Sequence, residues 1–161
     1  MTLLKFDPAA FNAAVTSLQP SFERLLGMEP ISYGQLPATK HMPRRGIYLF
    51  SEGEDYLYVG RSNNLRRRYR DHCSGDHNKA AFEMRLAREK TNKRATYTAG
   101  KDDVKSLMQD AGFKEAFFAA QDSIRKMEFR YVEQTCPIRQ ALLEIYCALA
   151  LKARHNDFEN H

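Results

Sequence analysis

Tyrosines, arginines and a histidine gather between residues 46 and 72 in an order that suits chemistry on a phosphate group. Two tyrosine-glycine triplets come first, Gly46-Ile47-Tyr48 and Tyr58-Val59-Gly60, and five arginines follow within residues 61–70. Guanidinium groups bind phosphate oxygens, and a histidine or an activated phenol can accept a proton from water. This stretch therefore indicates a site that binds and attacks a phosphate.

The arginine run has the spacing of a helix with one chemically mixed stripe. Leu65, Arg68, Tyr69 and His72 recur at i, i+3, i+4 and i+7, which places them on one side of a helix. A buried, unpaired guanidinium is costly, so Arg68 in such a stripe predicts an anion beside it. The other arginines of the run point elsewhere, as phosphate contacts or as a solvated face: Arg66, Arg67 and Arg70.

A second candidate lies near the C-terminal end. Residues 141–151, ALLEIYCALAL, contain a single carboxylate, Glu144, among apolar and aromatic residues, and we expect this helix to be largely buried. A lone carboxylate in such surroundings needs a cation or a set of hydrogen-bond donors, since otherwise it takes up a proton. The residues alone leave two interpretations open: a metal ion, or a salt bridge to one of the arginines.

Taken together, these residues resemble the GIY-YIG nuclease family, which is named after the two triplets. Arg61 follows the second triplet, Arg68 lies on the next helix, and His72 comes one turn later, as in that family. Glu144 on a later helix and Asn156 beyond its end complete the pattern. The resemblance covers roughly residues 44–72 and 126–157.

The resemblance also implies a role for each residue. Glu144 is expected to hold one Mg²⁺ (or Mn²⁺) ion, Tyr48 to activate water, and Tyr58 to contact water or phosphate. Arg68 would clamp the scissile phosphate from one side and Arg61 from the other. His72 would take the proton of the water directly or hold a tyrosine in place. Asn156 would support the site by hydrogen bonding, although a helix stop explains it too.

The elements that must position these residues form an α+β fold: a small, three-stranded, mainly antiparallel sheet flanked by helices. GIYLF and YLYVG read as a hairpin around the loop SEGED, and residues 127–133 as the third strand. One domain is expected over residues 1–161, because this length can bury a core. Its parts are a helical extension (1–43), the hairpin and basic helix (44–72), a helical insertion (73–125), and the third strand with the metal-ligand helix (126–157).

Two stretches outside the motifs are less distinctive. Asp7-Pro8 has the pattern of a helix start, and Gly27 that of a helix end. Residues 80–90, AAFEMRLAREK, predict an exposed helix within the insertion, which is either a target-recognition module or a helical cover for the sheet. The histidines outside the motif lack zinc-site spacing and are expected at the surface: His41, His77, His155 and His161.

Composition narrows the class of protein. The net charge is +5, and residues 40–70, with eight basic and three acidic side chains, carry a net +5 by themselves, as expected of a phosphate-binding face. DNA is the partner that the resemblance implies. Three cysteines without a C-x-x-C motif favour reduced thiols and a cytoplasmic location. No signal peptide or membrane-spanning segment is expected.

The sequence thus predicts a metal-dependent DNA endonuclease with a GIY-YIG catalytic domain, of restriction or mobile-element type. One such site cuts one strand, so cutting both strands requires a homodimer or two visits. Two alternatives stay open: a nucleic-acid-binding module that has lost hydrolysis, and a nuclease acting on RNA or on branched DNA.

Overall fold

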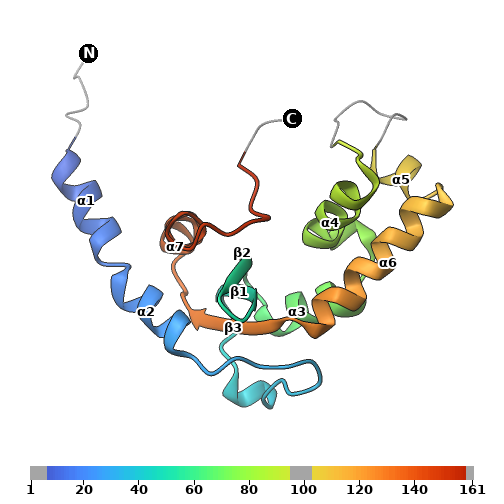
Figure 1. Cartoon of the computed structure of the whole chain (residues 1–161). Helices are drawn as coiled ribbons and strands as arrows, with labels where there is room; N and C mark the ends of the chain where they lie inside the picture. Colours follow the sequence, from blue (N-terminus) through green and yellow to red (C-terminus); the bar gives the residue numbers. More distant parts are fainter. Residues whose placement is uncertain (1–6, 95–102, 159–161) are drawn as a thin grey trace.

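A three-stranded antiparallel sheet lies at the centre of the molecule (Figure 1). The structure is a computed structural model that describes residues 7–94 and 103–158. The strands are β1 (Gly46–Glu52), β2 (Asp55–Ser62) and β3 (Glu128–Glu133), in the order β2-β1-β3. The predicted α+β class, with three strands flanked by helices, is confirmed.

The central strand β1 is covered on both faces. Residues alternate between the faces of a strand, so Tyr48 and Phe50 share one hydrophobic cluster while Ile47 and Leu49 share another. All four side chains are at most 1% exposed. This double burial explains why GIYLF is apolar throughout instead of alternating with polar residues.

The hairpin between β1 and β2 is tighter than the sequence suggested. SEGED was expected to be a loop, but both strands continue into it and only two residues lie between Glu52 and Asp55. Gly53 adopts a left-handed conformation with φ +58°, which a glycine tolerates without steric cost. A register shift between Phe50 and Ser51 accompanies this turn.

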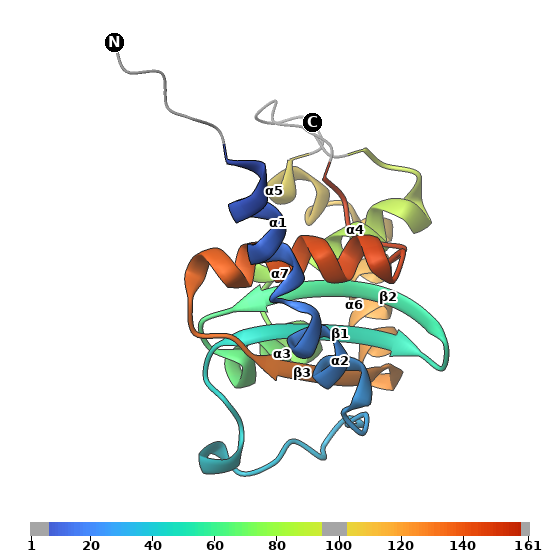
Figure 2. The same cartoon turned by 90° about the vertical axis from the view of Figure 1, so that its left-hand side faces the viewer.

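Helices cover the two faces of the sheet (Figures 1 and 2). The Tyr48 face meets helices that follow the hairpin: α3 (Leu65–Ser74), α4 (Ala81–Thr91) and α6 (Ala111–Lys126). The Ile47 face meets helices from the two ends of the chain, with α1 packed on α7: α1 (Pro8–Thr16), α2 (Gln19–Gly27) and α7 (Pro137–Ala150). Shorter pieces connect them: α5 (Val104–Leu107) and the 3₁₀ turns η1 (Thr39–His41) and η2 (His77–Lys79).

The N-terminal helix signals are borne out. The Asp7 carboxylate accepts hydrogen bonds from the backbone N–H groups of Ala9 and Ala10, at 3.0 and 3.3 Å, and Pro8 is the first helical residue. Gly27 is the last residue of α2.

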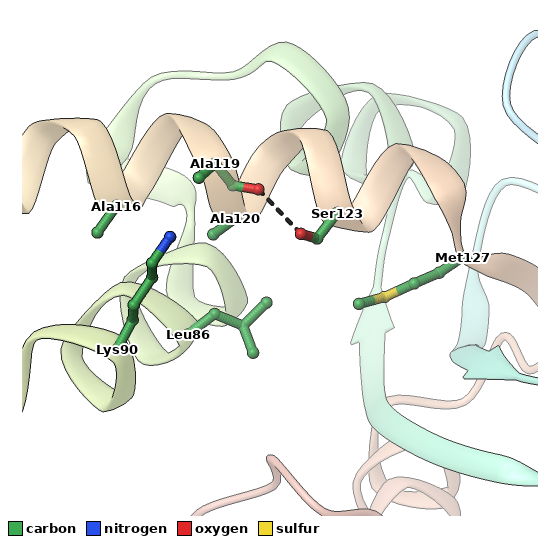
Figure 3. A pocket seen from close by; sticks show the side chains of 7 residues that line it. All are labelled: Leu86, Lys90, Ala116, Ala119, Ala120, Ser123 and Met127. Carbon is green, nitrogen blue, oxygen red and sulfur yellow. Dashed lines mark hydrogen bonds between the residues drawn. The ribbon is translucent and has the colours of Figure 1, made fainter.

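Helix α4 is not the exposed helix that the sequence predicted. Phe82, Glu83, Met84 and Ala87 are all buried, at 4% exposure or less. The helix packs against α6, which presents small side chains, among them Ala116 and Ala120, toward Leu86 and Lys90 of α4 (Figure 3). These residues line a pocket of about 160 Å³ between the two helices. Polar residues on the outer side of α4 thus conceal a buried inner side.

Helix α7 is less buried than predicted. Leu143 and Cys147 pack into the core, but Ile138, Ile145 and Leu149 are 72, 44 and 67% exposed. Only one side of the helix faces the sheet. The apolar residues on its other sides therefore stay exposed. None of the helices described here is long and apolar enough to cross a lipid bilayer.

Candidate active site

The site is built around the hydroxyl group of Tyr48. Its ring, 1% exposed, lies against β2 at the position where Tyr48 pairs with Gly60 in the strand ladder. A Cβ atom on Gly60 would lie 2.3 Å from the Tyr48 hydroxyl oxygen and 2.3 Å from Cζ. The glycine of the second triplet is therefore required by the tyrosine of the first, and the two triplets form one packing unit.

Helix α3 brings two side chains to the Tyr48 oxygen. Arg68 Nε donates a hydrogen bond to it at 3.1 Å, and His72 Nε2 lies 2.9 Å from it. The helix begins at a cap in which the Asn64 side chain accepts from the backbone N–H of Arg67 at 3.0 Å. Positions 68 and 72 are one turn apart, so both side chains reach the same atom, as the predicted stripe required.

His72 is buried and has a second partner. Its side chain is 0% exposed, and Nδ1 lies 3.1 Å from each carboxylate oxygen of Glu83, which is also 0% exposed. Its contact with Tyr48 fits the second of the two roles predicted for this histidine, which is to hold a tyrosine in place.

Glu83 is the residue that our sequence reasoning missed. It belongs to α4, within the insertion that matched no motif, and we expected that helix to be exposed. One signal was available: Ala80, Glu83 and Ala87 are spaced at i, i+3 and i+7, which places a lone carboxylate on a buried stripe. The same argument singled out Glu144.

Tyr58 lies next to Tyr48, with ring centroids 6.2 Å apart. Its ring stacks on Phe82 of α4 at 4.5 Å with an interplanar angle of 7°. Tyr58 is half-buried whereas Tyr48 is almost fully buried. The two phenols thus form an inner and an outer group of the same site.

Glu144 reaches this site from α7. Its Oε2 lies 3.0 Å from Arg61 Nε, and the two side chains are 24 and 48% exposed. Its negative charge raises the pKa of both Tyr48 and Tyr58. Glu144 thus lies within electrostatic range of both tyrosines, and its contact with Arg61 is the salt bridge that the sequence left as an alternative to a metal ion.

Burial and charge act in opposite directions on the acidic groups of the site. Burial is the main effect and raises the pKa of Tyr48, Tyr58 and Glu144 above their usual ranges. The positive charge of Arg68 lowers the pKa of all three groups, and Arg61 also lowers that of Glu144. Arg68 therefore favours negative charge on the two tyrosines, and Arg61 is the stronger of the two arginines at Glu144.

Asn156 holds the outer edge of β2. Its Oδ1 accepts from the backbone N–H of Val59 and its Nδ2 donates to the Val59 carbonyl, both at 2.8 Å. The two preceding residues pair with the same edge, as Arg154 and His155 donate their N–H groups to the carbonyls of Tyr56 and Leu57. Val59 lies between Tyr58 and Gly60, so Asn156 supports the second triplet through its backbone.

The same C-terminal segment corrects the assignment of His155 to the surface. This residue is 9% exposed, it packs 5.7 Å from the ring of Phe82, and its Nδ1 lies 3.2 Å from Glu89. His41 is exposed and His77 is half-buried, while His161 lies outside the described residues.

Comparison with known families decides how this cluster is to be understood. Residues 44–110 match the family model for the GIY-YIG catalytic domain. The chain carries a GIY-YIG catalytic domain. The matched domain is the catalytic domain of a family of nucleases. Neither a curated protein nor a solved structure shows a significant match to the chain.

Some residues of the site lie within the range that matches the GIY-YIG model, and others lie outside it. It includes the hairpin, α3 and α4, and therefore Tyr48, Tyr58, Arg68, His72 and Glu83. Glu144 and Asn156 follow the matched residues, and they join the site through the packing of α7 and the C-terminal segment on β2.

The residues present fit a metal ion held by one protein ligand. Hard divalent cations such as Mg²⁺ take carboxylate oxygens and often keep several waters, with one or two carboxylates supplied by the protein. Glu144 is partly exposed and offers such an oxygen. In the described residues no cluster of three histidines, cysteines or carboxylates exists, so a chelating all-protein cage is not built there. Glu144 would hold the ion of this GIY-YIG domain, and Arg61 would have to give up part of its contact.

The remaining arginines of α3 differ from one another. Arg67 lines an open depression of about 280 Å³ together with Arg68 and Asp71, beside the GIY-YIG cluster. Arg70 is exposed, whereas the guanidinium of Arg66 donates to the carbonyl of Pro37 in the segment that precedes the hairpin. Arg67 and Arg70 are thus presented to a ligand, while Arg66 is turned to the protein itself.

Proposed function

We propose that this chain is a divalent-metal-dependent endonuclease that hydrolyses phosphodiester bonds in DNA. The observation that carries the proposal is the convergence of Arg68 and His72 on the oxygen of Tyr48, at 3.1 and 2.9 Å. A phenol is a weak base until a positive group stabilises its phenolate. Arg68 and His72 are placed to do this.

In the proposed reaction Tyr48 acts as a phenolate: a water molecule attacks phosphorus, its proton passes to the Tyr48 oxygen, and the bond between phosphorus and the 3′ oxygen breaks. Arg68 offsets the charge that builds on the phosphoryl oxygens, Arg61 approaches from the β2 side, and Tyr58 contacts the water or the phosphate. His72 holds Tyr48 through Nε2. A bound Mg²⁺ or Mn²⁺ ion would reduce the charge on a phosphoryl oxygen and support the departing 3′ oxygen.

The placing of Glu144 supports the metal dependence. A carboxylate at the rim, 24% exposed and within electrostatic range of Arg68, can serve a hard cation and a phosphate together. The basic residues of α3 support a nucleic acid as substrate. We further propose that residues 1–161 act as one domain in a reducing compartment such as the cytoplasm, where unpaired thiols persist.

The test is cleavage of supercoiled plasmid DNA with Mg²⁺. We expect the parent protein to nick or linearise the plasmid, and Glu144→Ala to bind DNA without cleaving it. Glu115→Ala, which removes an exposed carboxylate from α6, is the matched control and is expected to cleave like the parent.

Equal cleavage by the parent and by Glu144→Ala would refute the metal-ligand role. A parent protein that binds DNA but cleaves neither plasmid, RNA nor branched DNA would instead be a nucleic-acid-binding module. Cleavage restricted to RNA or to branched DNA would change the substrate class and leave the chemistry intact. Restriction or mobile-element origin is tested by whether cleavage is confined to a fixed base sequence.

A further inference from the structure

The buried carboxylate of Glu83 has no role in the reaction described so far. Among the described residues, Glu83 and His72 form an ion-pair-type contact in which both side chains are 0% exposed. Taking a carboxylate and its partner out of water is unfavourable even when the two are hydrogen-bonded, and well-packed apolar residues of similar volume are often at least as stable. Glu83 therefore has a stability cost that a purely structural role does not explain.

The polar groups that face the His72 ring come from four elements. They are Tyr48 on β1, Tyr58 on β2, Glu83 on α4, and Arg68 on the same helix as His72. The rest of its surroundings is aromatic, with Phe50 and Phe82 at centroid distances of 5.3 and 6.3 Å. The ring therefore exchanges hydrogen bonds with Tyr48 on one side and Glu83 on the other.

The donor and acceptor properties of these groups set the direction of each hydrogen bond between Arg68, Tyr48, His72 and Glu83. An ionised carboxylate only accepts hydrogen bonds, so the proton on His72 Nδ1 points to Glu83. The guanidinium of Arg68 only donates, so the Tyr48 oxygen accepts from Arg68 Nε. The proton of Tyr48 itself is then directed at His72 Nε2, 2.9 Å away.

We propose that Glu83 is a positioning residue of the GIY-YIG site, which fixes His72 as the Nδ1–H tautomer and stabilises its imidazolium form. The proposal rests on the nuclease function above. The O–H bond of Tyr48 breaks and an N–H bond forms at His72 Nε2, so a phenolate arises beside Arg68 and an imidazolium beside Glu83. The four charges alternate in sign and sum to zero. The phenolate then takes the proton of the attacking water.

This arrangement explains how a buried phenol can act as a base. Burial raises the pKa of Tyr48, so a phenolate in this position requires a compensating charge and an acceptor for its proton. Arg68 supplies the charge, and His72 supplies the acceptor only if its Nε2 lone pair faces Tyr48. Glu83 enforces that orientation from α4, an element that carries none of the motif residues.

The chain contains a matched control on the same helix. Glu89, also on α4, forms a second carboxylate-histidine pair, with 3.1 Å between its Oε2 and Nδ1 of His155. Neither Glu89 nor His155 touches Tyr48. Glu83→Gln and Glu89→Gln therefore remove the same charge from the same kind of pair, and only the first pair reaches the phenol.

The experiment combines plasmid cleavage with ¹⁵N NMR of histidine-labelled protein. We expect Glu83→Gln to lower kcat about 100-fold, within the range for loss of general acid–base catalysis. KM and DNA affinity should stay within about twofold, because Glu83 is buried, while the Nδ1–H tautomer of His72 should no longer be the single form, since a glutamine amide can accept from Nδ1–H or donate to Nδ1. Glu89→Gln should cleave like the parent.

Each contrary result overturns the proposal. Finding the Nε2–H tautomer of His72 in the parent protein would overturn the proposal without any variant. This measurement does not depend on whether the protein cleaves a substrate. Parent-like cleavage by Glu83→Gln, or equal losses in Glu83→Gln and Glu89→Gln, would reduce Glu83 to a packing role. If the parent is inactive on every substrate, the nuclease function fails, whereas the tautomer still reports whether Glu83 orients His72.

Discussion

Gly60 lies so close to Tyr48 that adding one methyl group, by substitution with alanine, tests whether the position of the Tyr48 ring matters for activity. Gly60→Ala would place a Cβ 2.3 Å from the Tyr48 hydroxyl and displace the phenol from Arg68 and His72. We expect plasmid cleavage to fall at least 10²-fold, because a misplacement of about 1 Å has such effects. Overpacking should also cost about 1–3 kcal/mol of stability, measured by thermal unfolding.

The control for this substitution is Gly27→Ala. A Cβ at Gly27, the last residue of α2, would meet no atom within 4 Å. Cleavage and unfolding temperature should therefore match the parent. Full activity of Gly60→Ala would mean that the ring of Tyr48 does not depend on its place against β2.

We expect the Glu144 carboxylate to lower the free energy of unfolding, because it is kept for its proposed role as a metal ligand and not for stability. Burial raises its pKa in the folded protein above the usual value of 4.5, so the folded state prefers the protonated form. The stabilising contribution of that form is complete below pH 4.5 and is lost as pH rises through the folded pKa. At pH 7 without metal, Glu144→Gln should therefore be more stable than the parent by about 0.5–2 kcal/mol, as is common for functional residues.

Thermal unfolding at two pH values checks this prediction. The advantage of Glu144→Gln should shrink as the pH approaches 4, where the parent carboxylate is protonated as well. Glu115→Gln, on the exposed side of α6, should show no such pH-dependent gain. A parent that is more stable than Glu144→Gln at pH 7 would show that the salt bridge with Arg61 outweighs burial.

At the scale of single residues, the sequence identified side chains that share a stripe with apolar neighbours. Arg68 and His72 were found because a guanidinium and an imidazole stood at the helical spacing of Leu65 and Tyr69. Glu83 was not, because arginines, a lysine and a second glutamate on the outer side of α4 made that helix look exposed. Which helix contacts the His72 ring is set by tertiary packing, which spacing along the chain does not encode.

At the scale of elements, the C-terminal segment acts as a support for the edge of the sheet. Asn156→Asp tests it with almost no change of shape: one carboxylate oxygen would face the Val59 carbonyl, which now accepts from Nδ2 at 2.8 Å. Leaving that carbonyl without its donor should cost about 1–3 kcal/mol. Thermal unfolding measures the loss, and plasmid cleavage should fall with it, because Val59 separates Tyr58 from Gly60.

Asn12→Asp, on the exposed side of α1, introduces the same charge away from the sheet and should leave both properties unchanged. Loss of stability without loss of cleavage in Asn156→Asp would separate the edge of β2 from the chemistry. Asn156 would then be a structural residue only.

Local sequence signals predicted where helices and strands begin and end more reliably than they predicted which of their residues are buried. Asp7, Pro8 and Gly27 marked helix ends that the structure reproduces. Burial was misjudged for α4 and α7 in opposite directions, since the number of sides on which a helix has neighbours is a property of the fold. The two-residue turn at Gly53 was missed because the polar sequence SEGED is typical of loops, although β-strand pairing continues through most of it.

At the scale of the whole molecule, two basic residues of α3, Arg67 and Arg70, are exposed and lie outside the cluster around Tyr48. Arg67 lines the depression that adjoins Arg68, and Arg70 is exposed on the same helix, so we expect both to contact phosphates flanking the one that is cut. Contacts of this kind give affinity that is sensitive to salt without adding sequence specificity.

Binding of the protein to a DNA duplex should therefore weaken steeply with salt, and each phosphate contact contributes about −0.9 to the slope of log K against log salt. Replacing Arg67 and Arg70 by alanine should reduce that slope by up to about 2 and leave the rate at saturating DNA close to that of the parent. Lys105→Ala with Lys114→Ala, two exposed lysines on α5 and α6, removes the same charge elsewhere and should change the slope little. If both double variants lower the slope equally, the affinity for DNA depends on the net charge of +5 and not on a defined surface of α3.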